Sequence, residues 1–196
     1  YYCYCGYCRH KFEEEAGLDA LEIRYGTEEW SKWVDWRASQ ITSFVERATQ
    51  IVKSNRPEAT LQAYIAPWFS DTSKREEIYK IKERFGQDIK GLSTKLDIFA
   101  PMLYHRYVDD PDLKIDMEVG WVANMTRWIV QEGAPALVWS TVQAVKGQPA
   151  ETREAIREAF NGGAHGVIVF GIRLEDMEDQ WKEVKSVFSR VAEAEG

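Results

Sequence analysis

Short apolar runs alternate with helical stripes along most of this chain. Four runs have the length and apolar character of strands buried on both faces, which is typical of parallel sheets covered by helices: LQAYIA at 61–66, LDIFAPML at 96–103, ALVWSTVQAV at 136–145 and GVIVF at 166–170. A helical pattern follows each run, at 74–85, at 117–131, from Pro149 to the Gly162-Gly163 pair, and at 175–191. This order predicts four right-handed parallel βα units over residues 61–191.

A longer amphipathic helix is predicted ahead of these units, over residues 28–54. Its apolar positions form one stripe, which we expect to pack on a flat surface: Trp33, Trp36, Ile41, Phe44, Ala48 and Ile51. Residues 1–17 form a cysteine-rich entry segment with a short helix from Lys11 to Gly17. We interpret residues 1–196 as a single domain.

Four βα units amount to half of a (β/α)8 barrel of the TIM type, which usually has about 250 residues. The predicted fold class is therefore α/β, with this chain as the C-terminal half of such a barrel, about four βα units and a leading helix. An open four-stranded parallel sheet is the rival architecture. Since a half-barrel leaves two strands as bare edges, we expect an upstream half of the barrel or another chain to cover them.

The composition of the chain argues against two kinds of partner, nucleic acids and membranes. The net charge is −7, and the bases are scattered among more numerous acids, which argues against a nucleic-acid partner. No apolar run approaches the roughly 20 residues of a membrane span, and the N-terminus has no signal pattern, so no membrane partner is expected and the compartment stays unassigned. The chain begins at Tyr1 without a methionine, inside a dense motif, and we expect a preceding segment to be missing.

Polar and aromatic residues gather where the predicted strands end. Ligands of parallel α/β sheets and barrels bind outside the carboxyl ends of the strands, so residues there are candidates for a site. Neighbouring residues in a strand point to opposite sides. At most one of Tyr104 and His105 therefore faces a barrel interior, unless the strand has already ended before them. Any one of these residues is also compatible with a purely structural role in the core. The candidate substrate-binding residues are Tyr104, His105, Arg106, Trp68, Trp139 and Gln143.

The roles expected at this edge are those of a saccharide site. Eight tryptophans and nine tyrosines are either large core residues or flat surfaces on which sugar rings stack. His105 could orient a carboxylate or donate to it, Arg106 could pair with one, and Gln143 could bond a hydroxyl. His165 precedes a strand, and we expect it to be structural.

Glycoside hydrolysis usually requires two carboxyl groups across the scissile bond. Asp71 is the first candidate for a catalytic acid, although it could simply cap the helix that follows it. The other acids after strand ends are Asp109, Asp110, Glu175 and Asp176, and the last two are accounted for by the preference of helix N-termini for negative charge.

Cys3, Cys5 and Cys8 form a C-x-C-x-x-C motif and are the only cysteines. Three thiolates at this spacing favour a structural zinc site with a fourth ligand, which is either His10 or a residue upstream of Tyr1. Unligated thiols are the alternative. No organic cofactor is expected.

The segments CYCGYCRHKF, WVDWRASQI, APWF and FAPMLYH, in this order, resemble the C-terminal half of barrels in glycoside-hydrolase-like families found largely in bacteria. The cysteine motif is similar to the zinc cluster of glycoside hydrolase family 42 β-galactosidases, where the fourth cysteine lies upstream. The MLYH segment resembles the M-x-Y-D that ends strand six in family 18 chitinase-like barrels, with His105 at the aspartate position. The resemblance implies that the four strands are strands five to eight, and that the clearest acid lies just upstream of Tyr1.

Three functions are compatible with these patterns. The first is part of a carbohydrate-active enzyme, a glycoside hydrolase acting on a glycan once the missing half of the barrel is present. The second is a barrel that binds saccharide without turnover or has a structural role. The third, a barrel enzyme of another class, has little support because the chain has only three histidines and no strand-end lysine suited to a Schiff base.

Overall fold

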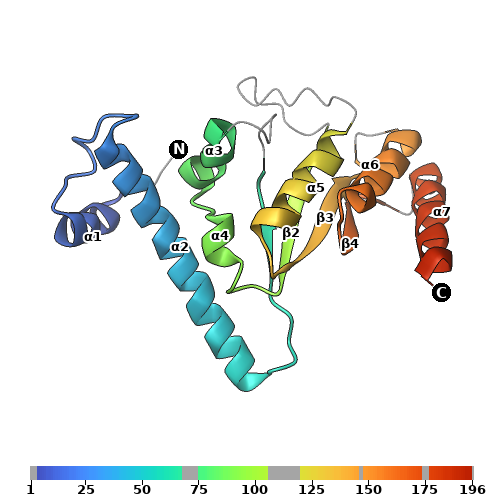
Figure 1. The fold of residues 1–196 in the computed structure, drawn as a ribbon, viewed down its shortest axis with the longest axis horizontal. Coiled ribbons are helices and arrows are strands. Elements are labelled where there is room, and N and C mark those ends of the chain that lie inside the picture. The colour runs from blue at the N-terminus through green and yellow to red at the C-terminus, as the bar shows by residue number, and fades with distance from the viewer. Residues whose placement is uncertain (1–3, 68–74, 106–119, 146–147, 174–176, 196) are drawn as a thin grey trace.

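The computed structural model describes residues 4–67, 75–105, 120–145, 148–173 and 177–195 (Figure 1). Helices and strands alternate after two leading helices, as the sequence patterns predict. In chain order the elements are α1 (Gly6–Ala16), α2 (Glu28–Asn55), β1 (Gln62–Ile65), α3 (Arg75–Phe85), α4 (Ile89–Leu92), β2 (Ile98–Leu103), α5 (Trp121–Glu132), β3 (Leu137–Gln143), α6 (Pro149–Asn161), β4 (Gly166–Phe170) and α7 (Glu178–Glu195).

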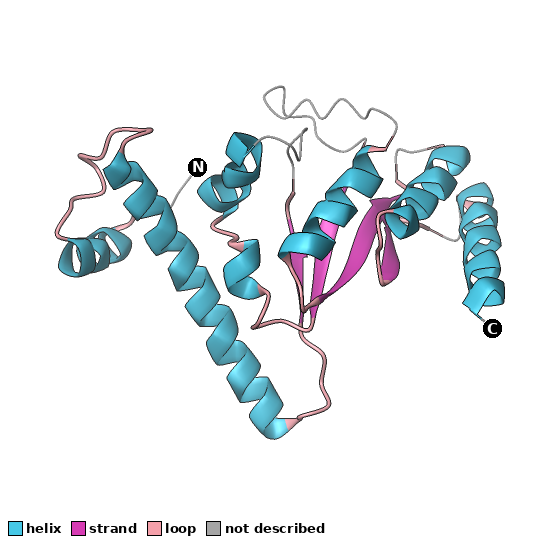
Figure 2. Cartoon of the chain, viewed as in Figure 1, coloured by secondary structure: helices cyan, strands magenta, loops and turns pink. Residues whose placement is uncertain are grey.

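The four strands form one parallel sheet whose order, β1-β2-β3-β4, is also their order in the chain (Figure 2). Gln62 pairs with Ile98, Ile98 with Leu137, and Trp139 with Gly166, so the strands start nearly level with one another. The α/β class and the parallel βα order are therefore confirmed. The sheet also confirms that the segments at 61–66 and 96–103 are adjacent and parallel.

The two faces of the sheet differ sharply. One face, which we call the helix face, carries Phe99, Leu103, Val138 and Val142, all fully buried in one core with residues from α3 to α7. Figure 1 shows α5 and α6 lying in front of the strands on this side. The alternate residues point the other way, and we call their side the open face. It carries four large apolar side chains that are each at least 38% exposed: Tyr64, Leu137, Trp139 and Phe170.

Helix α2 is held at both ends. It begins at Thr27, whose hydroxyl caps it by accepting from the Trp30 backbone amide at 3.2 Å. Near its C-terminal end, Lys53 contacts Asp97 at 2.9 Å, and Asp97 in turn accepts from the Leu61 amide at 2.8 Å. Through these polar contacts, Asp97 at the start of β2 holds both the C-terminal end of α2 and the residue before β1.

The predicted apolar stripe of α2 is only half covered. Its first part, with Trp33 and Trp36, packs against α1 in an aromatic cluster in which the two rings stack at 5.2 Å. Its second part is exposed, since Phe44 is 73% and Ile51 62% accessible. The expectation that the whole stripe packs on a flat surface is therefore wrong for the described residues, because periodicity shows which side of a helix is apolar and not what lies against it.

Element boundaries differ modestly from the predicted ones. Helix α1 starts at Gly6 instead of Lys11, and α7 continues to Glu195. The short helix α4 was not predicted, since its single turn depends on a local cap in which Asp88 accepts from the Gly91 amide at 3.2 Å. Within the part of the chain that the structure describes, no helix is both long and apolar enough to cross a membrane.

Candidate carbohydrate site at the carboxyl edge of the sheet

Three of the described residues at the carboxyl ends of β2, β3 and β4 lie in one row across the open face. Leu103 pairs with Val142 and Gln143 with Phe170, so Tyr104, Gln143 and Phe170 occupy successive places in the same row. The Tyr104 and Phe170 rings stack, with centroids 4.8 Å apart and planes 24° apart. Since these residues belong to strands that are not neighbours, the two rings meet across β3 and close over Gln143.

Gln143, which lies between Tyr104 and Phe170 in this row, is fully buried. Its Nε2 donates to the Val145 carbonyl oxygen at 2.7 Å, which fixes the amide against the loop that leaves β3. A buried amide held in this way is engaged within the protein. The predicted direct bond from Gln143 to a sugar hydroxyl is therefore not favoured by its burial.

His105 lies on the other side of the same strand end, as the alternation of side chains in a strand predicts. Its Nε2 is 3.7 Å from Glu151 Oε2, and its side chain is only 5% exposed. Glu151 belongs to the first turn of α6, where its carboxylate also accepts from the Gln148 amide at 3.1 Å in a capping box. One carboxylate thus caps a helix and pairs with the histidine at the end of β2.

Phe170 and Glu151 were not among the predicted site residues. Phe170 is the last residue of an apolar strand. An aromatic residue at a strand end is the sequence feature that could have identified it as a site residue. Glu151 sits three residues after Gln148 at a helix start, a pattern that indicates a cap and gives no hint of a histidine partner.

Trp139 does not join this group. It is the third residue of β3 and pairs with Gly166, the first residue of β4, so it lies in the amino-terminal half of the sheet. Its indole lies across Gly166, where an added Cβ would come within 2.9 Å of the ring. The placement of Trp139 at a carboxyl strand end is corrected by this register. Its side chain is 38% exposed on the open face.

Most of the remaining candidates lie outside the described residues. These are Trp68, Asp71 and Arg106, and the acids at 109, 110, 175 and 176. His165 is described, and its Nδ1 accepts from the Val138 amide at 3.1 Å at the amino edge of the sheet. That bond supports the structural role predicted for it.

The cysteine motif is described in part. Cys3 lies outside the described residues, Cys5 is the exposed residue that precedes α1, and Cys8 is half-buried against the aromatic cluster. His10 is exposed and lies 3.6 Å from Glu14. No group of three or more potential metal ligands occurs among the residues that could be searched, so the zinc site stays a prediction.

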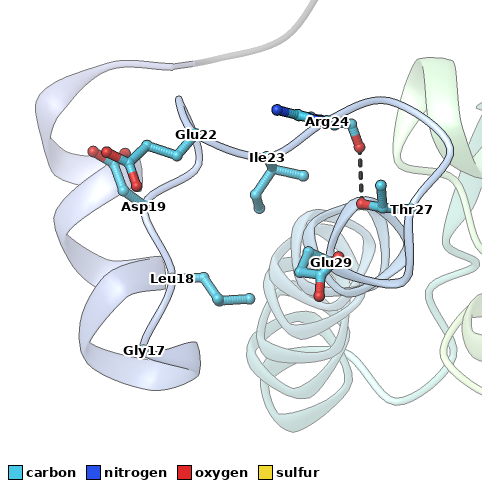
Figure 3. Close-up of a pocket in the computed structure, with 8 residues that line it drawn as sticks. All are labelled: Gly17, Leu18, Asp19, Glu22, Ile23, Arg24, Thr27 and Glu29. Atoms are coloured by element: carbon cyan, nitrogen blue, oxygen red, sulfur yellow. Dashed lines mark hydrogen bonds between the residues drawn. The ribbon is translucent and has the colours of Figure 1, made fainter.

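A separate hollow of about 370 Å³ lies at the connection between α1 and α2, well away from the strand ends (Figure 3). Two of the acids that line it, Asp19 and Glu29, already have partners. The Leu21 amide and the Arg9 guanidinium lower the pKa of Asp19, and hydrogen bonds at the helix start, including one from Thr27, lower the pKa of Glu29. These carboxylates stabilise the turn, and the hollow offers no nucleophile.

Comparison with known proteins adds no relative. No protein-family model, no curated protein and no solved structure matches the chain.

Proposed function

We propose that this chain is part of a carbohydrate-active enzyme, a glycoside hydrolase of the (β/α)8 type, to which it contributes four βα units. The observation that supports this best is the Tyr104–Phe170 ring pair at the carboxyl edge, where parallel sheets bind ligands. Phe170 is 41% exposed, so one aromatic surface is accessible there. A flat apolar ring beside polar groups suits the apolar face of a sugar.

The neighbouring groups fit a supporting role in hydrolysis. His105 and Glu151 form a mostly buried pair on the other side of the end of β2 from Tyr104, and such a pair can hold the position of a further carboxylate or of a substrate hydroxyl. Asp71 stays the candidate catalytic acid. The second carboxyl group that a glycosidase requires is expected from the other half of the barrel. The cysteine motif is proposed to hold a structural zinc whose fourth ligand is either His10 or a residue upstream of Tyr1.

One observation favours a second candidate, a barrel that binds saccharide without hydrolysing it. Among the described residues, Glu151 is the acid that contacts a residue at the end of β2, and its carboxylate is already used as a helix cap and as the partner of His105. A carboxylate held by two contacts within the protein is poorly placed to reach a glycosidic oxygen, which favours binding without hydrolysis.

Binding and turnover are tested separately. A panel of oligosaccharides is titrated against the chain by calorimetry, with Phe170→Ala as the test variant and Phe44→Ala as the matched control, since Phe44 is exposed but distant. Loss of the ring is expected to weaken binding about tenfold, corresponding to about 1.4 kcal/mol of stacking. Equal weakening by both variants, or no binding of any saccharide, would contradict the proposed site.

Hydrolysis is measured with aryl glycosides on a protein in which the other half of the barrel is present, since that half is expected to supply the second carboxyl group, and on its Asp71→Ala variant. Activity that Asp71→Ala abolishes supports the enzyme, whereas saccharide binding without turnover supports the binding module. Normal rates in Asp71→Ala would remove the assignment of that acid.

A further inference from the structure

The open face of the sheet exposes large apolar side chains of the kind that another part of a protein usually covers. Parallel sheets are buried on both faces in nearly all proteins. Here the described helices α3 to α7 contribute to one core on the helix face, while Tyr64 and Trp139 remain 51% and 38% exposed on the other side. The centre of the open face is nevertheless apolar and already buried, since Ile98 and Ala100 are 3% and 0% exposed.

The two ends of the described sheet are also open. Strands β1 and β4 each pair with one neighbour, so each has a row of backbone groups facing outward. Closing the sheet into a barrel is one way to remove bare edges of this kind. All four strands are parallel, which is the arrangement that a (β/α)8 barrel requires.

The helices that flank the two edges expose apolar side chains. At the β1 end, α2 exposes Phe44 and Ile51, which lie seven residues apart and therefore on one side of the helix. At the β4 end, α7 exposes Trp181 and Phe188, again seven residues apart, at 44% and 37%. Each edge strand is thus accompanied by a helix with uncovered apolar surface.

A count of helix positions determines what kind of partner fits. Each strand is followed by a helical segment, namely α3 with α4, then α5, α6 and α7, whereas α2 precedes β1 and belongs to a unit before it. A closed barrel has eight strands and eight helix positions. In a barrel made of two copies, α2 of one copy and α7 of the other would both require the position between β4 and β1. A second copy therefore does not fit.

We propose that the open face and both sheet edges bind a four-stranded parallel βα unit that is not a second copy of this chain. That unit carries a helix after each of its first three strands, and none after its fourth. The fourth strand pairs in parallel with β1 and lies beneath the exposed side of α2, which supplies the missing helix. This inference rests on the barrel in the proposed function but does not depend on saccharide binding.

The first test is the mass of the isolated chain in solution. Light scattering after size exclusion is expected to give the monomer, 22.7 kDa, across a wide concentration range. The monomer is also expected to bind a hydrophobic dye, since four large apolar side chains of its open face are exposed: Tyr64, Leu137, Trp139 and Phe170. A stable dimer of twice that mass whose open face no longer binds dye would overturn the proposal.

The second test uses two fusions that differ in one helix. In the first fusion, residues 61–173 precede residues 1–196, so that α2 occupies the position after the first β4 and the count is eight strands and eight helix positions. In the matched control, residues 61–196 precede residues 1–196, so that α7 and α2 compete for one position. The first fusion is expected to bind severalfold less dye and to melt at a higher temperature than the control. Equal behaviour of the two fusions would overturn the proposal.

A substitution on α2 gives an independent measurement. Phe44→Glu is expected to leave the melting temperature of the isolated chain unchanged, because Phe44 is 73% exposed there. The same substitution in the second half of the first fusion is expected to lower the melting temperature by several degrees, because the side chain is then covered. A fusion that tolerates Phe44→Glu as well as the isolated chain does would contradict the position assigned to the fourth strand. None of these measurements involves a sugar, so their failure is distinguishable from failure of the proposed function.

Discussion

A buried hydrogen bond joins α5 to the middle of the sheet, and it provides a sharp test of the core. Thr126 Oγ1 and Ser140 Oγ lie 2.8 Å apart, and both residues are fully buried. Thr126→Val or Ser140→Ala removes one hydroxyl and leaves the other in an apolar core without its partner. An unsatisfied buried polar group costs about 1–3 kcal/mol, so each single variant is expected to lose about 1–2 kcal/mol of unfolding free energy.

The double variant removes both groups together and leaves no unsatisfied hydroxyl. It is therefore expected to be more stable than the sum of the two single losses predicts, with a coupling energy of about 1 kcal/mol. Urea unfolding followed by circular dichroism measures all three free energies, provided that the slopes with denaturant agree. Thr60→Val, at an exposed position, is the control for the change of residue type. Additive losses in the double variant would refute the reasoning.

Two further predictions concern the strand ends. Hydrogen bonding to the Leu61 amide and to Lys53 lowers the pKa of Asp97 below 3.8, so its stabilisation is present above that pH and is lost as the pH falls through the lowered value. Asp97→Asn is expected to cost about 1 kcal/mol at pH 7, and the difference in melting temperature from the wild type should vanish near pH 2; a difference that persists there contradicts the account. Gly166→Ala places a methyl group 2.9 Å from the Trp139 ring, and we expect a loss of about 1–2 kcal/mol in urea unfolding that is largely absent when Trp139 is also replaced by Ala.

The elements of the fold could be predicted because they follow from local pattern. Apolar runs of strand length, such as 166–170, and the three-to-four spacing on α5 identify each element without reference to the others. The exposure of Phe44 could not be predicted, because it depends on which elements are present to cover α2. The turn of α4 was missed for a different reason, since one Asp88 cap stabilises it without any periodic pattern.

The sequence predicted the site residues at the end of β2 but not the residues of other elements that contact them. Tyr104 and His105 were expected to point to opposite sides of β2, and the ring contact with Phe170 and the pairing with Glu151 place them so. The partners themselves come from β4 and α6, and no local signal connects them with β2. Trp139 was misplaced because the strand was expected to end in or near residues 139–143, whereas β3 continues to Gln143, four residues beyond Trp139.

The strands have the same order in the sheet as in the chain, and this affects how the sheet can form during translation. Each new strand can pair with the one made just before it, so the sheet can grow by one βα unit at a time as the chain leaves the ribosome. The ring contact between Tyr104 and Phe170 is an exception, because it skips a strand. It forms only after β4 has emerged, and the carboxyl edge is therefore among the last parts of the sheet to be completed during translation.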